Sequence, residues 1–460
     1  MTTSSYSLEE RLLTPGDTEY ETARLAAVWN ERKPERWPDA IMLVHSEDDV
    51  VEAVSLARSR GWRLGIRSGG HSWIGNGVRD GGLLLDLSGL NNYTIDTEAQ
   101  TATAGPGMIG SFLVEQIAQH GLVFPGGHCP SVALGGYLLG AGYGWNSRDL
   151  GPACLSVAAV DVVLPNGELI HADDSSHPDL MWAVRGSGPG FFGIVTRFYL
   201  RLRPHYDRIV RAAYTFPLEI RDDLLAWSYD ILPSLPAKLE MSVKVGHTAG
   251  ITGQTASLTL AAFCSDGADA ADLLAPAEDF PELERAIRRV EPVDCTMADL
   301  YALSDALTPA GNRYAVDGIW CDGPVADIID AGRPVLDSLP TQKSFLLWML
   351  WGHFPPSEQA CWSAQAPLYF SPNAVWDRPD DDLHCERWAH HLPDRLAAIS
   401  RGTQFADANP ADRPDPGLSP ENAARLEHLR RRYDPDGLVR TYLTPAESTT
   451  QLARSRRPVR

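Results

Sequence analysis

From about residue 37 to residue 204, the pattern of apolar and polar positions is typical of short strands that alternate with helices. Ser46 and Asp49 have the spacing of a helix capping box, and Gly61 would end that helix in a left-handed conformation. We expect strands at 63–67, 83–87, 157–164 and 193–202, a hairpin of 93–96 with 101–104, a hairpin from 157–164 into 168–171, and helices at 109–119 and from 178.

The pattern changes after about residue 206. Residues 241–247, 255–264 and 344–353 have the length and composition of long strands, whereas 273–290, 297–307 and 423–432 have the periodicity of helices. Long strands next to helices predict an antiparallel sheet with helices on one face. The fold class expected for the whole chain is therefore α+β.

Composition excludes several classes of function. The chain has 460 residues, of which 44% are hydrophobic and 22% charged, and its net charge of −20 would repel a nucleic acid. The basic tail at 454–460 is interpreted as a frayed terminus. The start lacks the pattern of a signal peptide, and the longest apolar run, 345–350, is too short to span a bilayer. We expect neither a nucleic-acid nor a membrane partner.

Seven cysteines are scattered along the chain without close pairs or the spacing of a metal site. An odd number of unpaired thiols fits a reducing compartment, so the expected location is cytoplasmic and no metal is expected.

Two glycine-rich loops carry the chemistry. One contains His71 in the segment 67–72 (RSGGHS), and the other contains Cys129 in the segment 126–130 (GGHCP). A neutral imidazole and a thiolate are both nucleophiles that can bond to a flavin ring. The glycines allow the backbone to pass close to a planar ligand or a phosphate, and Arg67 would place a cation beside it. The pair predicts a flavin that is attached twice.

A third glycine-rich segment, 135–145, follows the second loop. A Rossmann nucleotide site would need a strand before it and a helix after it, but a loop precedes the segment and its glycines weaken a helix. We interpret the segment as wrapping a nucleotide, with a purely structural turn as the alternative.

The segments 67–72 and 127–136 closely resemble the flavin-binding loops of berberine-bridge-enzyme-like oxidoreductases, which belong to the vanillyl-alcohol-oxidase group with a PCMH-type FAD-binding domain. The segments 179–186, 191–196 and 432–436 resemble further blocks of that family in the same order. The resemblance is strong over residues 37–205 and moderate over 425–445. Between these two regions it is limited to the layout of the expected strands and helices. It implies a two-subdomain FAD-binding domain and a substrate domain with an antiparallel sheet flanked by helices. The implied division is an N-terminal segment 1–36, an FAD-binding domain 37–205, a substrate-binding domain 206–420, and a C-terminal segment 421–460 that returns to the FAD domain.

The resemblance also assigns roles to residues. His71 would hold FAD through the 8-methyl group of the ring and Cys129 through the neighbouring six-position carbon. The remaining cofactor contacts that it implies are Arg67, Ser68, Gly69, Gly70 and Ser72 at the pyrophosphate, Gly135, Gly136, Gly142 and Tyr143 along the cofactor, and the backbone of Gly193, Ile194 and Val195 at the adenosine end. Val132 stands where relatives that react with oxygen keep a side chain of modest size, which favours an oxidase.

The implied reaction moves a hydride from a C–H bond to flavin N5 while a base takes the proton of an adjoining O–H or N–H. The tyrosine that relatives often use as base is replaced here by Gln404, which cannot act as one. Candidate substitutes are Tyr369 and His353 on or next to expected strands, with Tyr314 and Asp407 as further options. The aromatic residues Trp348, Trp351 and Phe354 are interpreted as core rather than as a substrate platform.

We therefore expect an FAD-dependent oxidase that acts on an alcohol, hemiacetal or amine of a small natural product or sugar and returns the electrons to dioxygen as hydrogen peroxide. The first alternative is a dehydrogenase with another acceptor, and the second is a flavin-loaded protein that only binds a small molecule. The expected partners are the substrate and dioxygen, and the expected state is a monomer or a homodimer.

Overall fold

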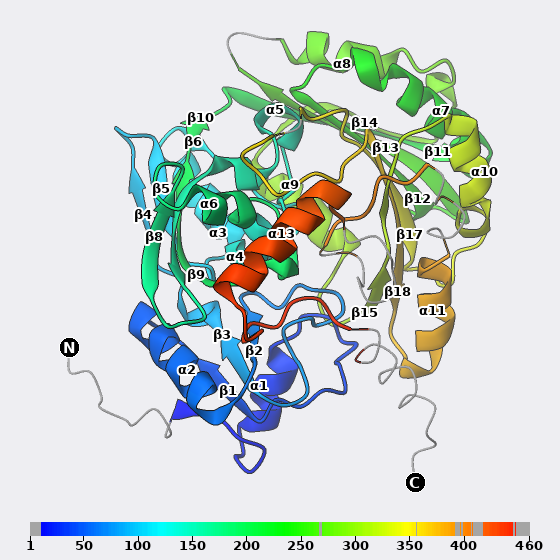
Figure 1. Cartoon of the computed structure of the whole chain (residues 1–460). Coiled ribbons are helices and arrows are strands. Elements are labelled where there is room, and N and C mark those ends of the chain that lie inside the picture. Colours follow the sequence, from blue (N-terminus) through cyan, green and yellow to red (C-terminus); the bar gives the residue numbers. More distant parts are fainter. Residues whose placement is uncertain are drawn as a thin grey trace.

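The computed structural model describes residues 11–265, 269–355, 357–391, 396, 399–405, 407, 417–444 and 447. The structure has the expected α+β class: strands β1–β10 and their helices form one half, and strands β11–β18 with theirs form the other (Figure 1). The basic tail at 454–460 lies outside the described residues.

The first three strands form a small parallel sheet in the order β1-β3-β2. Its elements are β1 (Ala40–Leu43), α2 (Glu47–Arg60), β2 (Leu64–Arg67) and β3 (Leu83–Asp86), preceded by α1 (Tyr20–Ala26). The predicted capping box is confirmed, because Asp49 N–H donates to the Ser46 side chain and Gly61 ends α2 with a φ of 63°. Since β2 ends at Arg67, the first glycine loop begins at the carboxyl edge of this sheet.

A five-stranded antiparallel sheet follows, in the order β4-β5-β9-β7-β8. Its strands are β4 (Tyr93–Asp96), β5 (Thr101–Ala104), β7 (Val157–Val163), β8 (Leu169–Asp173) and β9 (Ile194–Arg201). The helices of this region are α3 (Gly110–Ala118), α4 (Leu134–Leu139), α5 (Ser147–Leu150) and α6 (Pro178–Val184), and β6 (Leu122–Val123) pairs with β10 (Arg203–Pro204). Both expected hairpins are confirmed by their antiparallel pairing. The first residues of the third glycine-rich segment lie in the short helix α4, which ends at Leu139 and is capped by Gly140.

The second half is built on an eight-stranded sheet in the order β14-β11-β13-β12-β17-β18-β15, with β16 also paired to β18. The strands are β11 (Arg208–Pro217), β12 (Leu239–His247), β13 (Gln254–Cys264), β14 (Arg288–Cys295), β15 (Arg313–Val316), β16 (Ile319–Cys321), β17 (Phe345–Leu350) and β18 (Leu368–Trp376). The helices are α7 (Arg221–Ile231), α8 (Ala270–Glu278), α9 (Met297–Leu307), α10 (Val325–Leu336) and α11 (Asp382–Ala389). The pairings of β11 with β13 and of β12 with β17 are antiparallel, as expected.

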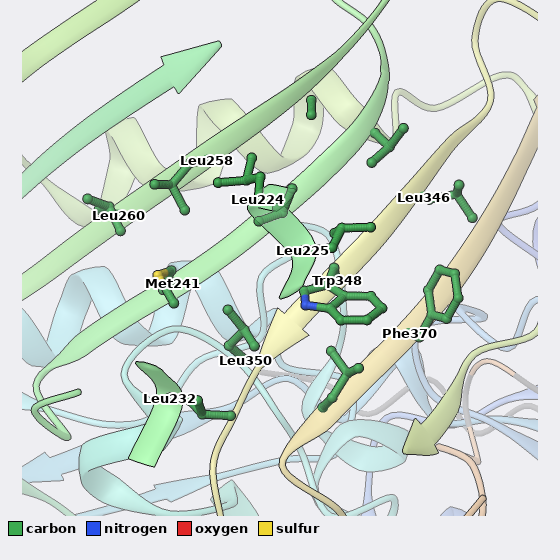
Figure 2. Close-up of a cluster of buried hydrophobic side chains, with 14 of the residues drawn as sticks. Leu224, Leu225, Leu232, Met241, Leu258, Leu260, Leu346, Trp348, Leu350 and Phe370 are labelled. Atoms are coloured by element: carbon green, nitrogen blue, oxygen red, sulfur yellow. The ribbon is translucent and has the colours of Figure 1, made fainter. Parts of the chain in front are cut away.

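Strand alternation divides this sheet into two faces. Met241, Val243 and Val245 of β12 are buried on the face that α7, α8 and α10 cover, together with Trp348 of β17 and residues of the neighbouring strands (Figures 1 and 2). The intervening residues of β12 point the other way, toward the first half of the chain. The position of Trp348 agrees with its interpretation as core.

The helix expected at 273–290 is wrong over its second half. Helix α8 ends at Glu278, and residues 288–295 form β14 instead. Pro281 disfavours helical conformation at the residue before it and removes a backbone donor. Strand β14 lies at the edge of the sheet and is largely exposed and charged, so no apolar alternation identifies it in the sequence.

The last described helix, α13 (Pro420–Tyr433), crosses in front of the first half in Figure 1. Arg432 donates to Asp179 over 2.9 Å. The chain then joins the first sheet, because Leu64 N–H donates to Leu438 O and Arg440 N–H donates to Leu64 O, both over 2.8 Å. The C-terminal segment thus closes one side of the space beside the first glycine loop.

Among the described residues, none of the helices combines the length and apolar character that crossing a bilayer requires. The same residues contain no cluster of three or more histidine, cysteine or acidic side chains arranged to hold a metal ion.

Candidate functional site

A cavity of about 700 Å³ lies between the two halves of the chain. Its floor consists of glycine-rich loops from the first half, and its roof is the face of the eight-stranded sheet opposite α7, α8 and α10, where α9 contributes Leu303, Ser304 and Leu307. Every residue that the sequence assigned to the cofactor lines this cavity: Arg67, Ser68, Gly69, Gly70, His71, Ser72, Cys129, Val132, Gly135, Gly136, Gly142, Tyr143, Gly193, Ile194 and Val195.

The first glycine loop is shaped by close backbone approaches. Gly70 has a φ of 75°, and a Cβ there would lie 2.5 Å from the carbonyl oxygen of Ala27. A Cβ on Gly69 would lie 2.8 Å from the Cβ of Ala133, so the first loop contacts the residues after Cys129. Arg67 pairs with Asp86 over 2.7 Å, which fixes its guanidinium at the cavity wall.

The imidazole of His71 is held as a neutral group. Its ring stacks on Trp29 with centroids 4.9 Å apart, and it hydrogen bonds to the backbone of Ser131. Burial, with a smaller contribution from the Arg67 charge, lowers the pKa of His71 from the ordinary 6.5 to about 4. At neutral pH the ring therefore carries one N–H, and the other nitrogen keeps its lone pair.

The second loop brings Cys129 to the same place. Its Sγ lies 3.5 Å from the hydroxyl of Ser131, the residue whose backbone contacts His71. Gly127 forms a backbone bridge with Gly144 of the third glycine-rich segment. The two nucleophiles from separate loops therefore face one cavity around a shared neighbour.

The third segment contributes both glycines and aromatic side chains to the floor. Gly142 has a φ of 76°, which allows the chain to turn after α4, while a Cβ on Gly136 would meet nothing within 4 Å. Tyr143 packs against Trp320, with ring centroids 4.9 Å apart, and its hydroxyl accepts a hydrogen bond from Trp362 Nε1. Burial raises the pKa of Tyr143, so this phenol stays protonated.

Two of the candidate catalytic residues form a pair in the cavity wall. The Tyr369 hydroxyl donates to Asp407 Oδ2 over 2.8 Å, and Trp73 Nε1 donates to Asp407 Oδ1 over 3.1 Å. Gln404 lines the cavity as well. The structure thus joins two alternatives that the sequence treated separately.

The other two candidates lie elsewhere. Tyr314 is buried in a cluster with Phe345 and Val375, and its hydroxyl donates to the backbone oxygen of Pro309. Strand β17 ends at Leu350, earlier than the expected strand 344–353. His353 therefore lies beyond the strand, and its side chain is exposed. Neither side chain lines the cavity.

Sequence reasoning missed a hydrogen-bonded pair of His128 and Glu240 in the cavity. His128 Nε2 lies 2.7 Å from Glu240 Oε1, and the other carboxylate oxygen accepts from the backbone of Asn146 over 3.2 Å. The position of Glu240 in a strand of alternating pattern was the available signal, since Glu240, Ser242 and Lys244 share one face. Trp351, expected as core, also lines the cavity.

The chain resembles known proteins over nearly its whole length. A family described as an FAD binding domain matches residues 38–173. The FAD-linked oxidoreductase janO of Penicillium janthinellum is 30% identical over 435 residues, which cover 92% of this chain and 94% of the relative. The crystal structure of 6-hydroxy-D-nicotine oxidase from Arthrobacter nicotinovorans superposes with a TM-score of 0.82 at 23% identity, covering 93% of this chain and 95% of the other. A berberine bridge enzyme variant described as a reticuline dehydrogenase gives a TM-score of 0.80 at 17% identity, with 95% and 97% covered. These two structural likenesses establish a shared fold.

Proposed function

Because the chain belongs to the FAD-linked oxidoreductases of the berberine-bridge-enzyme-like family, we propose that it is an oxidase whose FAD is bonded to both His71 and Cys129. The observation that carries this proposal is the meeting of both nucleophiles at one cavity, around Ser131. FAD dependence itself follows from the family.

The residues of the cavity fit a flavin dinucleotide. The floor has open space over Gly136, where a side chain would otherwise fill the volume. Residues 67–72 would hold the pyrophosphate with backbone N–H groups, and Gly193, Ile194 and Val195 would lie along the adenosine end. Gly135, Gly136, Gly142 and Tyr143 would lie along the rest of the cofactor.

Attachment is supported by the chemistry of both side chains. The depressed pKa of His71 leaves a nucleophilic nitrogen at every pH above about 5. Cys129 is partly exposed and free of any disulfide, so its sulfur is accessible from the cavity. When bound, FAD supplies a two-electron acceptor, and two covalent bonds to its ring would raise the reduction potential.

We assign the role of base to the Tyr369–Asp407 pair. The Tyr369 hydroxyl would orient the O–H or N–H of an alcohol, hemiacetal or amine substrate, and the proton would pass to the Asp407 carboxylate. Trp73 holds the second oxygen of Asp407, which keeps the carboxylate pointed at the hydroxyl. Gln404 would contribute a hydrogen bond to the substrate but no proton transfer.

Val132 supports reoxidation by dioxygen. It lines the cavity with a side chain of modest size, next to the loop that carries Cys129. Oxygen consumption with stoichiometric hydrogen peroxide would support an oxidase, whereas turnover only with an artificial acceptor in a sealed cell would show a dehydrogenase.

The attachment is tested on the denatured protein. We expect a yellow polypeptide that is heavier than the sequence by one FAD. His71→Ala and Cys129→Ala should each keep the pigment through the remaining bond, and the double variant should release it on unfolding. His45→Ala, an exposed histidine that does not line the cavity, is the matched control. Loss of all pigment from either single variant would refute two bonds.

A further inference from the structure

The roof of the cavity carries positive charge on a chain that is acidic overall. The sequence has 40 lysines and arginines against 60 acidic residues, yet Arg211 and Lys244 both line the cavity. The described lining residues include two carboxylates, Glu240 and Asp407, and both already accept hydrogen bonds from neighbouring side chains. The roof therefore favours an anionic ligand.

Lys244 is directed into the cavity by the alternation of β12. Its neighbours Val243 and Val245 belong to the core under the helices, so Lys244 occupies the opposite face. On that face it is paired across the sheet with Ser257 of β13 and Leu347 of β17, which also line the cavity. The side chain thus stands near the middle of the roof.

Among the described residues, no carboxylate forms an ion pair with the Lys244 ammonium. Its Nζ donates to the backbone oxygen of His247 over 3.0 Å, which uses one of three donors. Burial is the cause that lowers the pKa of Lys244, and no carboxylate of the described residues contributes. A partly buried cation without an anionic partner is costly, and the anionic group of a ligand would offset that cost.

The surroundings of Lys244 are hydroxyls and apolar side chains. The hydroxyls that line the cavity around it belong to Ser242 on β12, Ser257 on β13, Ser371 on β18 beyond β17, and Thr248 just after β12. Arg211 is paired with Ala261, which is paired with Glu240, four residues before Lys244. Four residues of strand span about 13 Å, so the backbones of Lys244 and Arg211 are separated along the strands as well as by the intervening β13.

We propose that Lys244 binds the carboxylate of an organic-acid substrate. The inference rests on the proposed function, because it names the substrate class for the same cavity. The positive charge of Lys244 would repel a cationic amine. Of the substrate classes proposed above, this favours a hydroxy acid or a related molecule with an anionic oxygen group.

The test compares carboxylates with their uncharged amides. Benzoate, phenylacetate and 3-phenylpropionate, each with the corresponding amide, are titrated calorimetrically into the full-length protein as purified with its flavin. We expect at least one acid to bind about tenfold to a hundredfold more tightly than its amide. Lys244→Met should remove that preference by weakening the acid and leaving the amide unchanged, and Lys244→Arg should retain part of it.

Lys343→Met is the matched control, because Lys343 is a half-exposed lysine that pairs with Asp377. If no acid binds the wild type more tightly than its amide, or if Lys244→Met keeps the preference, the inference is wrong. If Lys244→Met does not fold, the comparison of each acid with its amide, made on the wild type and on Lys244→Arg, still tests the inference. Calorimetry detects binding whether or not the flavin is attached covalently. Failure of the two-bond proposal would appear in the pigment assay on the denatured protein, whereas failure of the Lys244 inference would appear in the calorimetric titrations.

Discussion

The rate at which His71 bonds to FAD should hardly depend on pH between 7 and 5. The perturbation is Cys129→Ala, which leaves His71 as the single tether, so that only the imidazole reacts. Only the neutral imidazole has a nitrogen lone pair that can attack the flavin, and the neutral fraction at each pH follows from the pKa of His71.

The size of the expected pH effect on the bonding rate follows from the pKa of His71, which burial lowers. With a pKa of about 4 the ring is ~99.9% neutral at pH 7 and ~90% neutral at pH 5. An ordinary histidine with a pKa of 6.5 would be ~75% neutral at pH 7 but only ~3% neutral at pH 5. The buried site therefore predicts a rate loss of about a tenth, where an exposed imidazole would lose about 25-fold.

The assay uses Cys129→Ala protein produced without riboflavin and mixed with FAD at each pH. Samples are quenched in acid, and the flavin that stays with the denatured polypeptide is quantified by fluorescence. The double variant His71→Ala/Cys129→Ala, which binds FAD without bonding to it, measures whether occupancy itself changes with pH. If the bonding rate fell tenfold or more between pH 7 and pH 5 while the FAD occupancy stayed constant, the hypothesis of a neutral, desolvated His71 imidazole would be refuted.

Asp407→Asn should slow the reduction of the flavin by substrate about 10²–10⁴-fold in anaerobic stopped-flow measurements, because the amide keeps the place of the carboxylate but takes no proton; an unchanged rate would exclude Asp407 as the base. Val132→Leu should slow reoxidation by dioxygen in an oxygen electrode while turnover with an artificial acceptor is kept, and an equal loss in both assays would show general damage to the site. Gly69→Ala should cost about 1–3 kcal/mol of loop packing and lower the flavin content read from absorbance, because its Cβ would lie 2.8 Å from that of Ala133. Full occupancy would show that the two loops can separate.

Local features of the fold were predictable from the sequence. The cap of α2 depends on Ser46 and Asp49, three residues apart, and α9 has the predicted bounds of Met297–Leu307. The long strands β12 and β13 were predictable because their alternation is set by burial of one face. The edge strand β14 was not, since its conformation depends on pairing with β11, about 80 residues earlier, rather than on its own pattern.

The sequence by itself determined which residues could react with a cofactor, because His71 and Cys129 stand in contiguous glycine-rich segments whose chemistry is local. Only the tertiary structure decided which of these groups contact one another. Asp407 meets Tyr369 38 residues away and Trp73 334 residues away, while Glu240 meets His128 from 112 residues away. Such contacts depend on how sheets pack and how strands pair, which are properties of the whole chain. For the same reason, the sheet left Lys244 inside the cavity without a carboxylate partner among the described residues.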